Sequence, residues 1–243
     1  SLERIHSLLP EPDEILPGRT ITIMFQGPVT AGYAGVGEEL EQRGFYAHSD
    51  LLGITNQLLV RINPDGPIEM ENLWTDVVPG ILANGLYHAF RQIEVTAASH
   101  VNNVVTAGLA RQFEGEAFPG LETRLRTHLP DLADVNFDLS AEVEEKAWSL
   151  ARTTSDSVVF TVYQTDRYGA SLSEMYPVES GEFPVDVGAS VGRQVVLSYL
   201  ENNRDATPSL LVYIPVADIL EGSRFEASVD DQLPPSGPAS TYS

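Results

Sequence analysis

Apolar and polar residues alternate along much of this chain, the pattern expected of strands with one buried face. The alternation is clearest over Leu86–Ala97, and β-branched runs at Thr20–Gln26 and Gln57–Ile62 also show it. The second of these runs ends at Asn63–Pro67, a strong turn signal. Similar patterns predict further strands at Met70–Val78, Val101–Ala107, Ser157–Gln164, Leu172–Val178, Arg193–Leu200 and Leu210–Pro215.

One segment carries the signals of a helix. Ser140 is a good N-cap residue, and Glu142, Glu144 and Glu145 follow it in the first turns, where a helix favours negative charge. These signals predict a helix over Ala141–Arg152. Leu121–Leu129 fits either a short helix or a strand.

About nine or ten strands, spaced by proline and glycine turns, predict a mainly β fold. The repeated βα units of a parallel sheet are missing, so we expect an antiparallel jelly-roll β-barrel or sandwich with one short helix. Proline-rich ends predict an N-terminal arm at 1–18 and a C-terminal tail at 229–243. The jelly roll then occupies 19–228, with an irregular or β subdomain inserted around 107–155.

Charge changes this picture more than any motif. The 243 residues include 35 acidic and 14 basic side chains, giving a formal net charge of -21, and Lys146 is the only lysine. Such a charge opposes a compact fold through self-repulsion, which ~1 M salt screens to within ~3 Å. The composition therefore predicts adaptation to concentrated salt. It also argues against nucleic-acid binding, since the nearest approach to a cationic cluster, Arg124 and Arg126, has Glu122 beside it.

Two short motifs resemble catalytic or cofactor sites only superficially. Gly32–Gly37 follows a strand, but its glycine spacing does not fit a dinucleotide-binding turn, and Glu38 and Glu39 stand where a pyrophosphate would lie. A flexible inter-strand loop is the preferred interpretation. His48-Ser49-Asp50 contains the three residue types of a catalytic triad, but adjacent residues do not assemble one, so we expect a polar loop.

The remaining candidates also favour structural roles. No pair of histidines has the spacing of metal ligands on one helix, and solvated or hydrogen-bonded imidazoles are expected. Close carboxylates at Glu144/Glu145 and Asp230/Asp231 would suit a divalent ion but arise by chance in so acidic a chain. Trp74 and Trp148 are expected as core or interface anchors. With no cysteine, thiolate chemistry is excluded, and we predict no catalytic, cofactor-binding or metal residues. The histidines are His6, His48, His88, His100 and His128.

Size, acidity, the opening segment Ser1–Gln26 and the alternating segment Tyr87–Val95 together resemble the larger major capsid protein of haloarchaeal icosahedral viruses with an inner membrane. These are the vertical single β-barrel capsid proteins. The resemblance implies a non-enzymatic subunit of a virion, assembled in the host cytoplasm, and no cofactor. Expected partners are further copies of the chain and a second, smaller capsid protein in pseudo-hexameric capsomers, together with penton or membrane-associated virion proteins.

The resemblance also implies that residues 107–155 form an outward tower and that the arm and tail tie neighbours together. Two other functions compete with this one. A halophilic extracellular β-sandwich that binds carbohydrate or another ligand fits the same strand pattern. A cupin-like enzyme fits it less well, because no His-x-His…Glu constellation is present.

Overall fold

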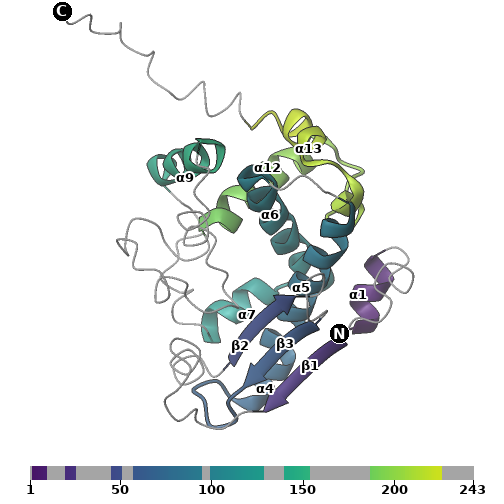
Figure 1. The fold of residues 1–243 in the computed structure, drawn as a ribbon, viewed down its shortest axis with the longest axis vertical. Helices are drawn as coiled ribbons and strands as arrows, with labels where there is room; N and C mark the ends of the chain where they lie inside the picture. Colours follow the sequence, from purple (N-terminus) through teal and green to yellow (C-terminus); the bar gives the residue numbers. More distant parts are fainter. Residues whose placement is uncertain are drawn as a thin grey trace, which may run out of the picture.

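The computed structural model describes residues 2–9, 20–25, 45–50, 57–94, 99–128, 140–153 and 187–225. Helices predominate in these ranges, and one small sheet lies at an end of the molecule (Figure 1). The helices are α1 (Leu2–Leu8), α4 (Met70–Asn72), the π-helix η1 (Leu73–Val77), α5 (Val78–Glu94), α6 (His100–Ala117), α7 (Leu121–His128), α9 (Ala141–Thr153), α12 (Val187–Asn202), the 3-10 helix η2 (Leu210–Tyr213) and α13 (Val216–Ser223).

The jelly roll is therefore wrong, and so is the single β-barrel. The protein is mainly helical, and its described residues contain three strands, whereas alternation predicted nine or ten over the whole chain. Five predicted strands lie in helical segments: Met70–Val78, the described part of Leu86–Ala97, Val101–Ala107, Arg193–Leu200 and Leu210–Pro215. The strand predictions at Ser157–Gln164 and Leu172–Val178 lie outside the described residues.

The sheet confirms two strand predictions. β1 (Thr20–Phe25) and β3 (Gln57–Ile62) pair in parallel, and β2 (Phe45–Asp50) runs antiparallel to β3 on its other side, giving the order β1-β3-β2. The predicted turn after β3 is present: Asn63 Oδ1 accepts a 3.0 Å hydrogen bond from the Asp65 amide. This turn leads the chain from the central strand directly into α4.

α5 is a helix that is buried on nearly every side. Every residue from Asp76 to Arg91 is buried except His88, which is partly exposed. Its apolar residues recur at the spacing of a helix, as at Leu82, Leu86 and Phe90, so the alternation over Leu86–Ala97 was the wrong period to follow. Gly85 faces Leu58 of β3, and a β-carbon there would lie 3.1 Å from the leucine methyls, so the sheet packs closely on this helix.

Proline determines how α5 begins. Helical backbone runs without a break from Met70 to Glu94, but in η1 the amide of Val78 bonds to the carbonyl of Leu73, five residues back. Pro79 lacks an amide hydrogen, and its ring would clash with the carbonyl four residues before it in a regular α-helix. The wider π turn relieves that clash immediately before the proline.

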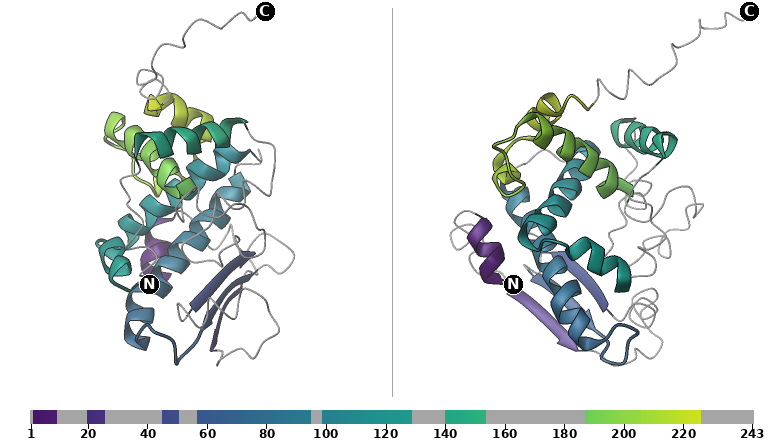
Figure 2. Two further views of the ribbon diagram at one scale, coloured as in Figure 1. Left: turned by 90° about the vertical axis from the view of Figure 1, so that its left-hand side faces the viewer. Right: turned by 180° about the vertical axis from the view of Figure 1, so that it is seen from behind.

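α6 forms an antiparallel hairpin with α5 and packs along α12 on its other side. Ser99 caps α6 by accepting a 3.1 Å hydrogen bond from the Asn102 amide, which fixes where this helix begins. α6 and α12 approach so closely at Gly108 and Gly192 that a β-carbon on either residue would collide with backbone atoms of the other helix. The core consequently runs from the sheet through α5 and α6 to α12 (Figure 2).

The predicted helix at Ala141–Arg152 is confirmed as α9, and the open choice at Leu121–Leu129 resolves to the helix α7. Ser140 accepts a 3.4 Å bond from the Val143 amide at the predicted cap. Trp148 is buried, as expected of an anchor, and meets Phe225 edge-on with the ring centroids 5.5 Å apart. Trp74 is not a core residue: it is 41% exposed and contacts only the exposed ring of Phe25 among the described aromatic residues.

Two segments predicted to lie outside a barrel contribute to the helical core. In the predicted arm, Ile5 and Leu9 are buried among the hydrophobic residues of the core. In the predicted insertion, residues 107–128 belong to α6, its connection and α7. The tail at 229–243 lies outside the described residues. None of the described helices combines the length and the hydropathy needed to cross a membrane.

Candidate functional site

A buried arginine joins α5 to the segment around η2. Arg91 is 1% exposed, and its Nε donates to Thr106 Oγ1 on α6 at 3.1 Å. Its two terminal nitrogens donate to three backbone carbonyls of the η2 segment, at 2.7, 3.2 and 2.8 Å. Burial lowers the pKa of Arg91, and the nearby Tyr87 opposes that shift. The guanidinium therefore acts as a cap for the end of η2; the three carbonyls belong to Leu211, Val212 and Ile214.

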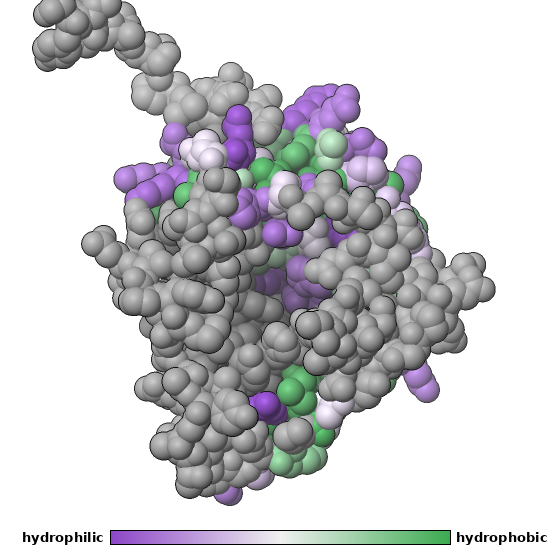
Figure 3. All heavy atoms as spheres, in the orientation of Figure 1, coloured by the Kyte–Doolittle hydropathy of each residue, from purple (hydrophilic) through white to green (hydrophobic). Residues whose placement is uncertain are grey.

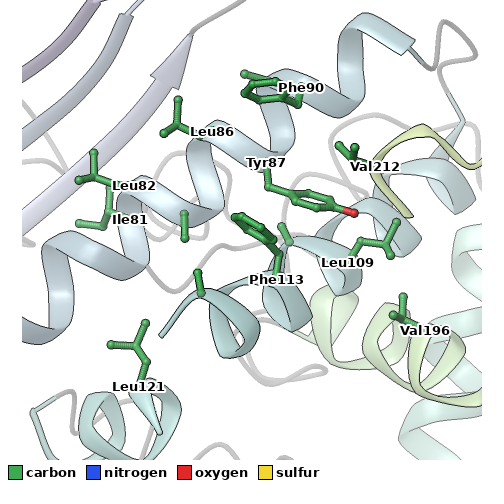
Figure 4. Close-up of a cluster of buried hydrophobic side chains, with 14 of the residues drawn as sticks. Ile81, Leu82, Leu86, Tyr87, Phe90, Leu109, Phe113, Leu121, Val196 and Val212 are labelled. Carbon is green, nitrogen blue, oxygen red and sulfur yellow. The ribbon is translucent and has the colours of Figure 1, made fainter. Parts of the chain in front are cut away.

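Two further side chains hold the same segment. The Tyr87 hydroxyl donates to the Pro208 carbonyl at 2.9 Å, and the Glu116 carboxylate accepts from both the amide and the hydroxyl of Ser209, each at 2.8 Å. Figure 4 shows the Tyr87 ring against Phe113 between α5 and α6, with Val212 beyond its hydroxyl end. These polar groups hold η2 in place, so we assign them a structural role.

Burial raises the pKa of Tyr87 well above its ordinary value, and Glu116 adds to the rise while Arg91 opposes it. Because the folded protein keeps this proton after the unfolded chain has lost it, the contribution of Tyr87 to stability is complete below about pH 10 and falls above it. We expect the free energy of unfolding to drop by about 1.4 kcal/mol per pH unit from this group alone.

Denaturant titrations between pH 9 and pH 11 measure this slope. Tyr87→Phe should be less stable at pH 8, because its hydrogen bond is lost, but should show a shallower alkaline decline. Tyr213→Phe, at an exposed tyrosine on η2, serves as the control and should keep the wild-type slope. Identical alkaline slopes in all three proteins would contradict the assignment.

Charged side chains from three elements meet at a second place, which we call the charged cluster. Asp76, on η1, is 5% exposed, and its two oxygens have different partners: Arg124 Nε at 2.7 Å and His128 Nε2 at 3.2 Å. Arg124 also donates to the Pro119 carbonyl at 3.2 Å. The buried carboxylate thus fixes one guanidinium and one imidazole of α7. The cluster comprises Asp76, Glu122, Arg124, Arg126, His128 and Arg193.

Glu122 links the α7 side of the cluster to α12. One carboxylate oxygen lies 3.2 Å from Arg126 Nη2, and the other lies 3.5 Å from Arg193 Nη2. Sequence analysis brought together Glu122, Arg124 and Arg126 because they are close in the chain. His128 was expected only as a solvated or hydrogen-bonded histidine, and it is hydrogen-bonded here to Asp76. Asp76 and Arg193 were missed, because they carry no local signal and reach the cluster only through the fold. We take the charged cluster as the candidate functional site.

No family model, curated protein or solved structure matches this chain. Its function must therefore be argued from its own residues.

The residues singled out from the sequence are scattered in the structure. His48, Ser49 and Asp50 are consecutive residues of β2, so the polar loop predicted there is wrong. His88 and His100 lie on consecutive helices and not on strands, while exposed His6 is on α1. Glu144 and Glu145 lie on α9, and burial raises the pKa of the Glu144 carboxyl. The Gly32–Gly37 segment and the Asp230/Asp231 pair lie outside the described residues.

Within the described ranges, no three histidine or carboxylate side chains are placed to hold a metal ion. Asn84 and His88 are one helical turn apart on α5, the spacing of paired zinc ligands in an H-E-x-x-H helix. Here, however, Asn84 and Gly85 stand where that motif has its first histidine and its glutamate. Asn84 instead donates a 2.8 Å hydrogen bond to the buried carboxylate of Glu114, so the two polar groups satisfy each other between α5 and α6.

Proposed function

We propose that this chain is a non-catalytic structural protein that works beside copies of itself in concentrated salt. One observation carries the proposal: within the described ranges, ten exposed carboxylates make no ion pair. They are Glu3, Asp65, Glu69, Glu71, Glu142, Glu145, Glu201, Asp205, Asp218 and Glu221.

The cations are placed differently from the anions. Arg91 and Arg111 are buried, and Arg124, Arg126 and Arg193 are committed to the charged cluster. The cations outside these two groups that are exposed, Arg4, Lys146, Arg152, Arg204 and Arg224, are half as many as the ten carboxylates, so the described surface is negative. Figure 3 shows hydrophilic side chains of described residues along the upper margin of one face. Dissolved cations must supply the neutralisation that ion pairs do not.

Concentrated ions also allow such surfaces to approach one another. At ~1 M salt the Debye length is ~3 Å, so like-charged subunits repel only near contact. Strong salt meanwhile favours the burial of apolar side chains such as Trp74 and Phe25, both exposed here. Association of copies is therefore expected at molar salt and opposed in dilute buffer.

The capsid role expected from the sequence remains a prediction within this proposal, together with its smaller capsid partner. Its support is reduced, because Tyr87–Val95, one of the segments that carried the resemblance, belongs mostly to the buried helix α5. Size and acidity still support it. The jelly roll forms no part of the proposal, and the β-sandwich form of the carbohydrate-binding alternative is dropped with it.

Light scattering of the purified full chain tests the proposal during dialysis from about 1 M to about 0.01 M NaCl, where the Debye length grows to ~30 Å. We expect large assemblies at high salt that dissociate as salt falls. Electron micrographs at molar salt would then show whether the assemblies are closed shells. A chain that stays monomeric across the whole range would refute the structural role.

A further inference from the structure

We propose that the charged cluster is a binding site for a small oxyanion, a phosphate or carboxylate group carried by a ligand. Its charge is the first argument. The guanidinium groups of Arg124, Arg126 and Arg193 converge here with the carboxylates of Asp76 and Glu122. In a chain of net charge -21, three guanidinium groups gathered in one place are a local exception that attracts anions.

The second argument is that two of its donors are already held in place. Asp76 binds Arg124 through Nε and His128 through Nε2, and Pro119 holds Arg124 through its carbonyl. The Arg124 side chain remains 44% exposed and that of His128 20% exposed. Donors that are fixed before a ligand arrives lose little conformational freedom on binding, which favours affinity.

Glu122 indicates where the oxyanion would sit. Its carboxylate lies between Arg126 and Arg193, the position that a bound carboxylate or phosphate would take between two guanidinium groups. The 3.5 Å contact with Arg193 is longer than a charge-assisted hydrogen bond, so this internal carboxylate satisfies Arg193 poorly. Moreover, Arg193 Nε is buried and has no hydrogen-bond partner in the structure. A ligand cannot reach that buried nitrogen, but the Arg193 side chain is 26% exposed, so an incoming oxyanion would take the place of Glu122 at its terminal nitrogens.

This arrangement predicts opposite effects for two substitutions. Glu122→Gln removes the competing negative charge, and we expect it to tighten oxyanion binding about 10-fold. Arg193→Gln removes a guanidinium group that would contact the oxyanion, and we expect it to weaken binding about 10-fold or more, because hydrogen bonds between charged groups are stronger than those between neutral groups. A purely structural ion-pair network would show no saturable binding of an oxyanion, and the two substitutions would not change its affinity in opposite directions.

Isothermal titration calorimetry of the full chain with inorganic phosphate, and separately with citrate, tests the site at a constant ~1 M NaCl, where non-specific charge effects are screened. Arg204→Gln, at an exposed arginine just after α12, is the matched control and should bind as the wild type does. Binding of phosphate alone, or of citrate alone, identifies the ligand chemistry.

Thermal unfolding of each variant checks that it folds. If Arg193→Gln fails to fold, the tighter oxyanion binding expected of Glu122→Gln still tests the proposal. The absence of saturable binding of both probes by the wild-type chain, or equal affinities in the wild type and Glu122→Gln, would overturn the proposal.

Discussion

Gly192→Ala should destabilise the protein by on the order of 3 kcal/mol or more, the upper range for overpacked cores. A β-carbon at Gly192 would collide with the carbonyl oxygen of Val104, and one at Gly108 would collide with the Gly192 backbone. Backbone atoms cannot turn away as a flexible side chain can, so α6 and α12 would have to separate. Because a domain has only ~5–15 kcal/mol of total stability, much of the population should unfold at moderate temperature.

Gly115→Ala is the matched control for this prediction. Gly115 lies on α6, as Gly108 does, but a β-carbon there meets nothing within 4 Å. Replacing it should stabilise the helix by about 0.5–1 kcal/mol through reduced backbone entropy of the unfolded chain. Thermal unfolding followed by circular dichroism at molar salt should show opposite shifts for the two variants. Equal shifts would show that the helix crossing is looser than described.

Dilution of salt should unfold the chain itself, independently of any assembly. Without screening, two carboxylates ~20 Å apart repel by about 0.2 kcal/mol in water. Because the chain has a net charge of -21, such repulsions outnumber the attractions to its basic side chains, and their sum reaches several kcal/mol, comparable with the total stability of a domain. We therefore expect the unfolding temperature to fall steeply between about 1 M and 0.01 M NaCl, as the Debye length increases from ~3 to ~30 Å.

Neutralising part of the acidic surface should weaken that dependence. Glu142→Gln, Glu145→Gln and Glu201→Gln remove three exposed carboxylates that make no ion pair in the described structure. The triple variant should retain its fold at a lower salt concentration than the wild type. Ser149→Ala, at an exposed neutral position of α9, should leave the salt midpoint unchanged. If the unfolding temperature of the wild type did not depend on salt, the prediction that this chain is adapted to concentrated salt would be wrong.

The sequence predicted correctly those elements whose signals lie in residues that are neighbours in the chain. β-branched runs gave β1 and β3, and the Ser140 cap with its following glutamates gave α9. α5 was missed because its buried face is so wide that an alternating pattern from Leu86 onwards could be read beside its helical period. The π turn at Leu73–Val77 adds a residue to the turn before α5, which disturbs the helical period over the predicted strand Met70–Val78.

The candidate site could be predicted only where its residues are neighbours in sequence. Glu122 and Arg126 are four apart, a spacing that places them together on any helix. Asp76 lies 48 residues from Arg124 and 52 from His128, so only the packing of η1 against α7 brings them together. No local pattern marks Arg193, because its role depends on where α12 crosses the molecule.

The choice of acceptors around Arg91 affects how this part of the fold responds to salt. Its guanidinium bonds only to neutral oxygens, those of one hydroxyl and three peptide groups. A contact between a charge and fixed dipoles, sealed from the solvent, does not compete with dissolved chloride or sodium as a surface ion pair does. The hydrogen bonds between Arg91 and the η2 segment should therefore be equally strong in dilute buffer and in saturated salt. The salt dependence of stability should come from the exposed carboxylates.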